Sequence, residues 1–546
     1  MVYVQILRYR FFLARAREQH NVSVVLPARR GVIADRNRHI LAFDIPSFSL
    51  YAKPRNIPEE EKEEIARKLA LVLEMREDFI LKRLRRDKAF VWIKRKISME
   101  KRAEVDNLGI NGLGWIREYS RFYPDENLAS QVLGFVNIDR KGMAGVEMFY
   151  EDFLHGQDGK MILVRDGRMI KVPLRDEDYV PPRDGLNLQL TIDEVIQNIT
   201  EKALDWMMEK FHPSSAWAVV MDPFTGEVLA MASRPTYNPN YYYKSNPECM
   251  RNRAISDMFE PGSVFKIITA SAALEEGVVT EETKIFCENG AYKVYSHILH
   301  DYHPYGELTF REVIEKSSNI GTVKVAQMLG EDKLYDYIVR FGFGKETGID
   351  LPGEIAGSLR PVSSWSKLSI SAVPMGQEIG VTAIQLACAV SVIANGGYWV
   401  QPYVAKEVFD AKGVRLKDLS RGKRRFKVIS SDTASRVRDI MVGVVERGTG
   451  RRAKIKGFKV AGKTGTAQRI IDGKYSNIYF TSSFVGFVPA QQPQVVIVVS
   501  AQTKKPFHFG GVVAAPTFKR IAENVLNYLG ISPTVTSQEG SEVRRQ

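Results

Sequence analysis

The chain has 546 residues, of which 44% are hydrophobic, and its 77 Lys and Arg against 64 Asp and Glu give a net charge of +13. This length and this hydrophobic content exclude a disordered chain and suffice for at least two sizeable domains with their own cores. The positive charge is compatible with nucleic-acid binding, but no recognised nucleic-acid motif accompanies it. Three cysteines, Cys249, Cys287 and Cys388, are too few for a disulfide framework, although a Cys249–Cys287 bridge stays open.

The first part of the chain has no run of eighteen apolar residues, the length that a membrane-spanning helix needs. Arginines 8, 10, 15 and 17 also exclude the apolar core of a signal peptide at the start. Residues 59–105 are dense in Lys, Arg and Glu, with Ile65, Leu69 and Leu73 at helical spacing. This pattern predicts charged helices with a solvated face. We expect the first domain to end around residues 184–193.

The second part of the chain alternates predicted strands and helices, which indicates an α/β domain. Residues 215–231 read as a strand, a Pro-Phe-Thr-Gly turn and a second strand; 310–316 and 384–394 as helices; 482–489 and 494–501 as strands; and 518–529 as a terminal helix. Cys388 falls in one of these apolar helices and is expected to be buried. The polar residues 531–546 are expected to form a disordered tail.

Ser263 and Lys266 are predicted to share one face of a helix. Glu-Pro-Gly directly before Ser263 breaks the chain, and an apolar run over residues 264–274 then indicates a buried helix that ends before Gly277. Ser263 would lie at the helix N-terminus, where free N–H groups and the dipole favour a developing anion. Lys266 follows one turn later, and a lysine in a dry pocket can act as a base toward the serine. The alternative, a helix cap and a solvated charge, is disfavoured in so apolar a helix.

Ser317 and Asn319 follow the predicted helix 310–316. Small polar side chains at such a junction suit a proton relay and an amide-holding group. Turns and caps favour the same residue types, so taken alone these two residues would indicate only a turn.

A Lys-Thr-Gly-Thr motif follows residues 458–461, which alternate like a strand. Its members are Lys463, Thr464, Gly465 and Thr466. The lysine can attract a carboxylate, the hydroxyls can hydrogen-bond it, and the glycine lets a substrate backbone approach closely. A strand edge also offers the backbone pairing that an extended peptide needs. The alternative is a plain glycine-containing strand end.

The order of the three motifs carries the specificity. Ser-x-x-Lys also occurs at Ser98, Ser364 and Ser420, so that motif alone is weak, whereas Ser-x-Asn and Lys-Thr-Gly each occur once. Together the three motifs indicate a serine enzyme that acylates itself on an amide.

One competing constellation lies between the first two motifs. It consists of His297, His300, Asp301 and His303. These residue types bind metals, but their spacing matches no His-Glu-x-x-His pattern, so a metal site is disfavoured.

The three motifs are the signature of penicillin-binding proteins and serine β-lactamases, and the surrounding sequence resembles the class B penicillin-binding proteins, which are monofunctional D,D-transpeptidases. The similar segments are residues 30–37, 41–42, 121–124, 133–135, 145–147, 190–193, 222–230, 233–235, 259–263 and 347–354. Residues 482–490 and 510–516 are more similar to the septal, cell-division (FtsI-type) branch than to the elongation branch. Arg38 replaces the glycine that is usual after Asp-Arg-Asn, a departure that concerns a local turn and not the chemistry.

The resemblance implies a two-domain α/β (α+β) fold. Residues 25–190 would form an N-terminal pedestal, and residues 212–530 a transpeptidase domain with a central antiparallel sheet flanked by helices. Family members usually have one N-terminal membrane anchor, so residues 1–24 would be a juxtamembrane segment and the catalytic domain would lie outside the inner membrane, in the periplasm. In that location the positive charge fits attraction to anionic lipid and acidic wall polymer better than nucleic-acid binding.

The resemblance also implies the site residues. The catalytic set would be Ser263, Lys266, Ser317, Lys463 and Asn319, which would hold the peptide amide, and the substrate-binding set would be Thr464, Gly465 and Thr466. Ser263 would attack the carbonyl between the two terminal D-alanines of a peptidoglycan stem peptide while Lys266 takes its proton. Ser317 and Lys463 would return that proton to the departing D-alanine, and the N–H groups of Ser263 and Thr466 would form the oxyanion hole. An amine of a neighbouring stem would complete the cross-link, and β-lactams would stall the acyl-enzyme.

The implied partners are peptidoglycan stem peptides, β-lactams, a membrane glycosyltransferase and division proteins, with no metal, cofactor or nucleic acid. Two alternatives, a β-lactamase and a D,D-carboxypeptidase, share the acylation step but let water deacylate the serine, and the long pedestal disfavours both. A non-enzymatic division scaffold acting through residues 25–190 is disfavoured by the intact Ser263, Lys266 and Lys463.

Overall fold

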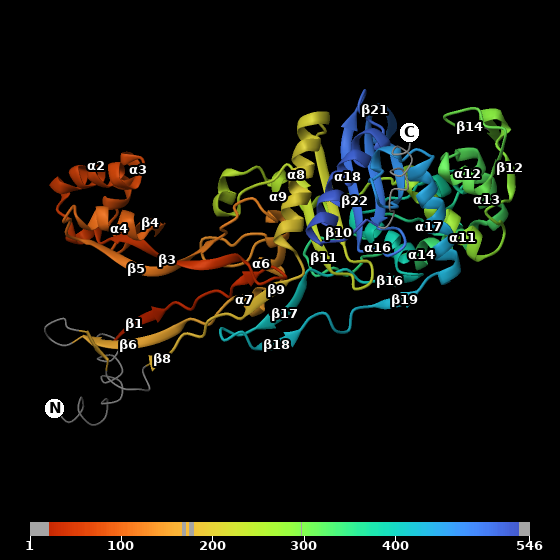
Figure 1. The fold of residues 1–546 in the computed structure, drawn as a ribbon. Helices are drawn as coiled ribbons and strands as arrows, with labels where there is room; N and C mark the ends of the chain where they lie inside the picture. Colours follow the sequence, from red (N-terminus) through yellow and green to blue (C-terminus); the bar gives the residue numbers. More distant parts are fainter. Residues whose placement is uncertain (1–20, 166–170, 174–178, 296, 534–546) are drawn as a thin grey trace, which may run out of the picture.

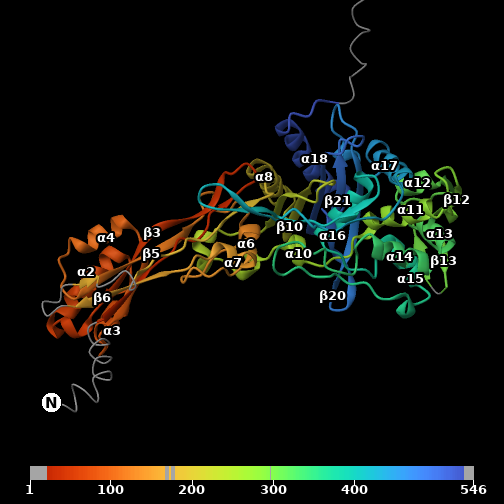
Figure 2. The same ribbon diagram turned by 90° about the horizontal axis from the view of Figure 1, so that it is seen from below.

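The computed structural model describes residues 21–165, 171–173, 179–295 and 297–533. The molecule is elongated in two perpendicular views, with a large α/β domain at one end, long strands in the middle and three small helices at the other end (Figures 1 and 2). This arrangement confirms the expected two-domain α+β fold. The expectations for residues 1–20 and 534–546 lie outside the described residues.

The pedestal is built on a seven-stranded sheet with the strand order β18-β17-β9-β2-β3-β4, in which β5 also pairs with β3. The strands are β2 (Ile33–Ala34), β3 (Ile40–Ala52), β4 (Val91–Ile97), β5 (Leu113–Phe122), β9 (Asn187–Leu190), β17 (Ala405–Phe409) and β18 (Arg415–Asp418). Two of these strands, β17 and β18, come from the second half of the chain. The sheet of the pedestal is therefore completed by a segment more than two hundred residues away in sequence.

The predicted charged helices at the far end of the pedestal are present. They are α2 (Lys62–Leu73), α3 (Glu77–Leu84) and α4 (Met99–Asp106). Ile65, Leu69 and Leu73 are buried as their spacing predicts. A second sheet starts with β1 (Asn21–Leu26), which pairs antiparallel with β6 (Gly159–Arg165). Residues 21–24, which the sequence analysis assigned to a juxtamembrane segment, form the start of this strand.

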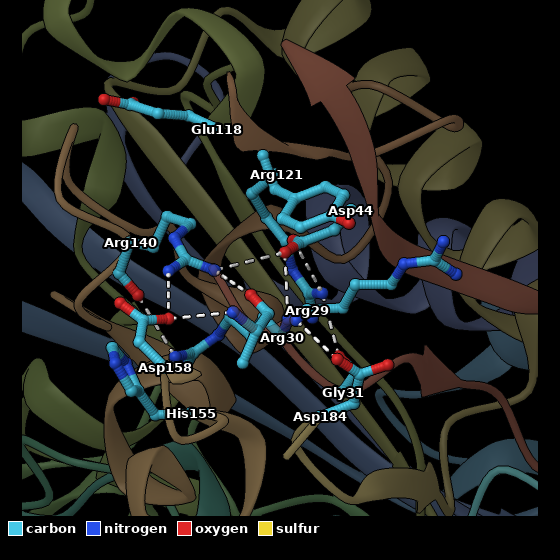
Figure 3. A network of polar contacts seen from close by, with 12 residues as sticks. Arg29, Arg30, Gly31, Asp44, Glu118, Arg121, Arg140, His155, Asp158 and Asp184 are labelled. Atoms are coloured by element: carbon cyan, nitrogen blue, oxygen red, sulfur yellow. Dashed lines mark hydrogen bonds and ion pairs between the residues drawn. The ribbon is translucent and has the colours of Figure 1, made fainter. Parts of the chain in front are cut away.

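A network of charged side chains joins several segments of the pedestal, and Figure 3 shows the part around Arg140, Asp44 and Asp158. Glu147 is fully buried and accepts hydrogen bonds from the guanidinium groups of Arg30 (2.6 Å) and Arg121 (2.7 Å). Burial opposes ionisation of Glu147, but the two guanidinium charges outweigh it and hold the pKa of this carboxyl below its usual value. Arg140 lies between Asp44 and Asp158 in the same network. Three of the pedestal segments that resemble the family, residues 30–37, 121–124 and 145–147, thus meet at one carboxylate.

The α/β domain contains a five-stranded, wholly antiparallel sheet in the order β11-β10-β22-β21-β20. The strands are β10 (Ser215–Met221), β11 (Val228–Arg234), β20 (Ala461–Ile471), β21 (Lys474–Val488) and β22 (Val495–Lys504). One face packs on α8 (Glu194–Phe211) and α18 (Gly510–Tyr528), and the other on α16 (Ala383–Ala394) and its neighbours. Each face has its own apolar core because alternate residues of a strand point to opposite sides.

Most predicted elements of this domain are confirmed. The strand pair in 215–231, the two late strands, α16 and α12 (Phe310–Glu315) occur where they were expected. The terminal helix begins at Gly510 and not at residue 518, because Pro516 is accommodated inside it. All three cysteines are free thiols, so Cys249 and Cys287 are not bridged, and Cys388 is buried. No helix in the described ranges is long and apolar enough to cross a membrane.

Candidate active site

Ser263 lies in a 3₁₀ turn, Gly262–Phe265, that leads directly into helix α11 (Lys266–Glu275). The helix start predicted from sequence is therefore correct in place, although its first turn is tighter than an α-helix. In a 3₁₀ turn the side chains at i and i+3 are eclipsed, which brings Lys266 onto the same side as Ser263. A backbone hydrogen bond holds this turn in place, because the N–H of Gly262 donates to the carbonyl oxygen of Gly376 at 3.1 Å.

The Lys266 side chain is fully buried and surrounded by acceptors. Its Nζ donates to the Ser317 carbonyl oxygen at 2.7 Å, to the Ser317 Oγ at 3.3 Å and to the Asn319 Oδ1 at 2.7 Å. Desolvation lowers the pKa of Lys266 to about 7, and the charge of Asp301 opposes this shift. An ammonium would use all three acceptors, whereas a neutral amine retains two donors and gains a lone pair. Lys266 can therefore exchange a proton near neutral pH.

Lys463 is a second fully buried lysine in the same site. Its Nζ donates to the Ser317 Oγ at 2.9 Å and to the carbonyl oxygen of Thr464 at 3.2 Å. Burial and the nearby charge of Lys266 hold the pKa of Lys463 well below its usual value. The Ser317 hydroxyl thus lies between two lysine nitrogens, an arrangement that can pass a proton between them.

The backbone at Ser317 explains how one residue reaches both lysines. Its φ of +61° is left-handed, a conformation that non-glycine residues adopt rarely and that usually ends a helix. Helix α12 ends just before it, and α13 (Asn319–Leu329) begins two residues later with Ser318 as the N-cap. This sharp junction turns both the carbonyl and the hydroxyl of Ser317 toward the lysines, and such local strain is common at functional sites.

Asp301 holds this junction in place. Its carboxylate accepts hydrogen bonds from the Ser318 hydroxyl (2.6 Å) and from the backbone N–H groups of Asn319 (2.5 Å) and Ile320 (3.1 Å). A carboxylate at a helix N-terminus satisfies free N–H groups and is favoured by the dipole. The side-chain amide of Asn319 also donates to the carbonyl oxygen of His300 at 2.9 Å. Both oxygens of Asp301 are thus engaged with the helix start.

The Lys-Thr-Gly-Thr motif lies on β20, which pairs only with β21 and forms an edge of the five-stranded sheet. The strand runs through the motif, whereas the sequence indicated a strand before it. A Cβ on Gly465 would lie 2.7 Å from the Pro261 carbonyl oxygen and 2.7 Å from a methyl carbon of Val264. In this structure the glycine therefore provides room for the turn that carries Ser263. The edge strand and the turn that carries Ser263 are in direct contact as a result.

Ser263, Ser317, Asn319, Thr464 and Thr466 line one cleft of about 620 Å³. Tyr302 and Phe509 contribute an aromatic wall, with ring centroids 5.9 Å apart. The cleft is bordered by the edge of β20, and the N–H of Gly510 donates to the Thr466 Oγ1 at 3.0 Å. Lys266 and Lys463 do not line the cleft themselves but contact the Ser317 hydroxyl that does, and Gly465 packs against the turn that carries Ser263.

Two family models match the chain. The penicillin-binding protein transpeptidase domain matches residues 216–523, and the penicillin-binding protein dimerisation domain matches residues 25–190. The chain belongs to the class B penicillin-binding proteins. In this penicillin-binding protein the three motifs lie within the transpeptidase match, and the buried network around Glu147 lies within the dimerisation match.

Relatives of similar length support the assignment. The chain is 37% identical to stage V sporulation protein D of Bacillus subtilis over 97% of this chain and 83% of that protein. It is 32% identical to the peptidoglycan D,D-transpeptidase FtsI of Escherichia coli over 92% and 84%, respectively. A solved peptidoglycan synthetase from Bifidobacterium adolescentis superimposes with a TM-score of 0.76 at 27% identity, covering 94% of this chain and 98% of that one. Penicillin-binding protein 3 of Mycobacterium tuberculosis gives 0.73 at 28% identity, with the same coverage.

Sequence reasoning missed several residues of the site. Asp301 was noticed only as a member of a disfavoured metal cluster, and its contact with α13 has no signature in the local sequence. Thr449 hydrogen-bonds the Thr464 hydroxyl at 2.7 Å and belongs to no segment used in the prediction. Gly510, whose N–H donates to Thr466, lies in a segment used only for the family resemblance. The Gly-Thr-Gly at residues 448–450 was an available signal for Thr449.

Proposed function

We propose that the protein is a serine D,D-transpeptidase that cross-links peptidoglycan stem peptides through an acyl-enzyme on Ser263. The observation that carries this proposal is the chain of contacts from Lys266 through the Ser317 hydroxyl to Lys463, in the cleft that Ser263 lines. The two buried lysines, whose pKa values are lowered, would supply a base and a proton relay.

Acylation would begin with neutral Lys266 accepting the proton of the Ser263 hydroxyl as its oxygen attacks the carbonyl between the two terminal D-alanines. The N–H groups of Ser263 and Thr466 are the proposed oxyanion hole, in which one donor contributes about 3 kcal/mol in enzymes of this kind. A Cβ on Gly262 would lie 3.0 Å from the Thr466 carbonyl oxygen. The backbone before Ser263 is therefore adjacent to the backbone of Thr466, as a shared oxyanion hole requires.

Collapse of the tetrahedral intermediate would break the C–N bond and release D-alanine. The Ser317 hydroxyl would donate a proton to the leaving amine and take back the proton that Lys266 accepted from Ser263, since the Lys266 Nζ contacts it at 3.3 Å, while Lys463 holds the hydroxyl at 2.9 Å. Asn319 would hold the peptide amide of the donor. An amine of a second stem peptide would then attack the ester carbonyl, form the new amide bond and return the hydroxyl to Ser263.

Substrate would bind as an added strand along β20, whose outer edge is unpaired in the described sheet. Thr464 and Thr466 would receive the terminal carboxylate. β-Lactams would enter the same site as donor analogues; the similar Mycobacterium tuberculosis protein was crystallised with aztreonam and with ampicillin. We further propose a septal role and a membrane-anchored periplasmic location, which the similarity to FtsI of Escherichia coli supports.

The test is intact-protein mass spectrometry after exposure to penicillin. The wild-type mass should rise by that of one penicillin molecule, the adduct should persist for many minutes, and Ser263→Ala should show no adduct. A rapidly lost adduct would indicate a β-lactamase. No adduct on the wild-type protein would indicate a scaffold without catalysis.

A further inference from the structure

The cleft that contains Ser263 has one positively charged wall. Its charged lining residues are Lys316, Arg447, Arg451 and Arg452, and no carboxylate among the described residues lines it. Two of these cations have acidic partners, since Lys316 contacts Glu312 at 3.1 Å and Arg447 contacts Glu315 at 2.5 Å. Arg451 and Arg452 pair with no carboxylate in the described part of the chain. The wall thus presents two uncompensated guanidinium groups to the cleft.

The two arginines adjoin the substrate-binding threonines. They open the short turn Arg451–Ala453, which follows Thr449 closely in the chain. Thr449 and Thr464 are joined through their hydroxyls at 2.7 Å, so the turn begins beside the Lys-Thr-Gly-Thr motif. The Arg451 side chain is also held in place, because its Nε and Nη2 donate to the carbonyl oxygen of Arg447 at 3.2 and 2.7 Å. The Nη1 group and the second hydrogen of Nη2 stay free for a bidentate anion.

In the proposed function the leaving group is D-alanine, which has a carboxylate on the carbon that bears its amine. That carboxylate lies at Thr464 and Thr466 before acylation, next to the charged wall. The acceptor amine must later approach the same ester carbonyl of Ser263 from the space that the D-alanine amine has left. An acceptor that carries a carboxylate beside its amine would place this anion against the arginines.

Resting on that proposed function, we propose that Arg451 and Arg452 select the acceptor: they bind a carboxylate attached to the same carbon as the attacking amine. The preferred acceptor is thus an α-amino acid centre and not an isolated amine or an amidated one. In the step itself the amine nitrogen forms a C–N bond with the acyl carbonyl, the bond from that carbon to the Ser263 Oγ breaks, and one amine proton ends on the serine hydroxyl. The arginines bind and orient the acceptor and take no proton.

The experiment measures how the acyl-enzyme partitions between two small acceptors. A D-alanyl thioester forms the acyl-enzyme, and D-alanine or D-alaninamide then competes with water for it; the two amines differ only in the carboxylate. Each of Arg451→Gln and Arg452→Gln should lower the preference for D-alanine about fivefold relative to wild type. The two amines differ in intrinsic reactivity, but this difference is the same for variant and wild type, so it cancels when their preferences are compared. Added salt should reduce the preference of the wild-type enzyme and have less effect on the variants.

Lys454→Gln is the matched control, because it removes one positive charge from the same segment while the Lys454 ammonium is already paired with Glu446 at 2.5 Å. It should leave the preference unchanged. An unchanged preference in both arginine variants would overturn the inference. The inference would also be overturned if the variants only slowed acylation by the thioester, because the arginines would then bind the donor and not the acceptor. Failure of the wild-type enzyme to form any acyl-enzyme would instead refute the proposed function.

Discussion

The lowered pKa of Lys266 predicts how acylation depends on pH. If neutral Lys266 is the base, the second-order rate constant for acylation by penicillin follows the neutral fraction of this lysine. With a pKa of about 7, that fraction is about one half at pH 7 and falls about tenfold for each further pH unit toward acid. A lysine at its ordinary value of 10.5 would be neutral in only about one molecule in three thousand at pH 7.

The size of the pKa shift of Lys266 gives the free energy by which the pocket disfavours the charged form. Lowering the pKa from 10.5 to about 7 means that the pocket disfavours the ammonium by about 5 kcal/mol relative to water. Burial is the main cause, and the nearby carboxylate of Asp301 opposes it. Asp301→Asn keeps the shape of the side chain and an acceptor for the helix N–H groups but removes the charge. This change should lower the pKa of Lys266 further and move the acid limb of the profile toward lower pH.

The assay is stopped-flow or fluorescent-penicillin labelling between pH 5 and 9 with the wild-type protein and Asp301→Asn. We expect a plateau above neutral pH, a midpoint near 7 and a unit slope on the acid side for the wild type. A rate that does not change over this range, or that still rises steeply between pH 8 and 9, would refute the role of Lys266 as the base. A shift of the Asp301→Asn midpoint toward higher pH would refute the electrostatic reasoning.

Two further substitutions test the packing around the site and in the pedestal. Gly465→Ala should slow penicillin acylation about 10 to 100-fold without unfolding the protein, because the new Cβ would lie 2.7 Å from the Pro261 carbonyl oxygen and would push β20 away from the nucleophile. Glu147→Ala should destabilise the protein by about 3 to 5 kcal/mol, measured by urea unfolding, because it leaves the guanidinium groups of Arg30 and Arg121 buried without their carboxylate.

Each substitution has a control of the same kind. Gly306→Ala adds a methyl group whose nearest neighbour, the Asn289 Oδ1, is at an ordinary 3.6 Å, and it should leave acylation unchanged. Glu64→Ala breaks an exposed pair with Lys68 and should leave the urea midpoint almost unchanged. Equal effects of Glu147→Ala and Glu64→Ala would contradict the claim that burial makes the network important.

The catalytic motifs could be predicted from sequence because each depends on short spacing. The eclipsed side chains of Ser263 and Lys266 follow from their spacing of three residues in a helical turn, and Ser317 lies two residues before Asn319 in the chain. That the three motifs meet in space could be expected only from the family resemblance. No local sequence pattern predicts that the Lys463 Nζ lies 2.9 Å from the Ser317 hydroxyl.

The missed features depend on tertiary contacts. Asp301 lies seventeen residues before Ser318, which donates to it, and only the folded loop makes it a helix cap. Ser317 takes a left-handed φ that sequence patterns assign to glycine. Helix α18 was predicted to start at residue 518 but starts at Gly510; Pro516 usually breaks a helix, and here it lies inside one.

The two strands that the second half of the chain contributes to the pedestal affect how the protein is synthesised. During translation the pedestal cannot complete its sheet until residues 405–418 have left the ribosome, by which time most of the domain that bears Ser263 has also emerged. Until then one edge of β9 has no partner strand. An exposed strand edge in an incompletely folded chain can pair with the wrong strand. The pedestal therefore cannot complete its sheet before the second half of the chain is synthesised. A cut at residue 190 would separate β9 from β17 and β18, so the sheet would be incomplete in both pieces.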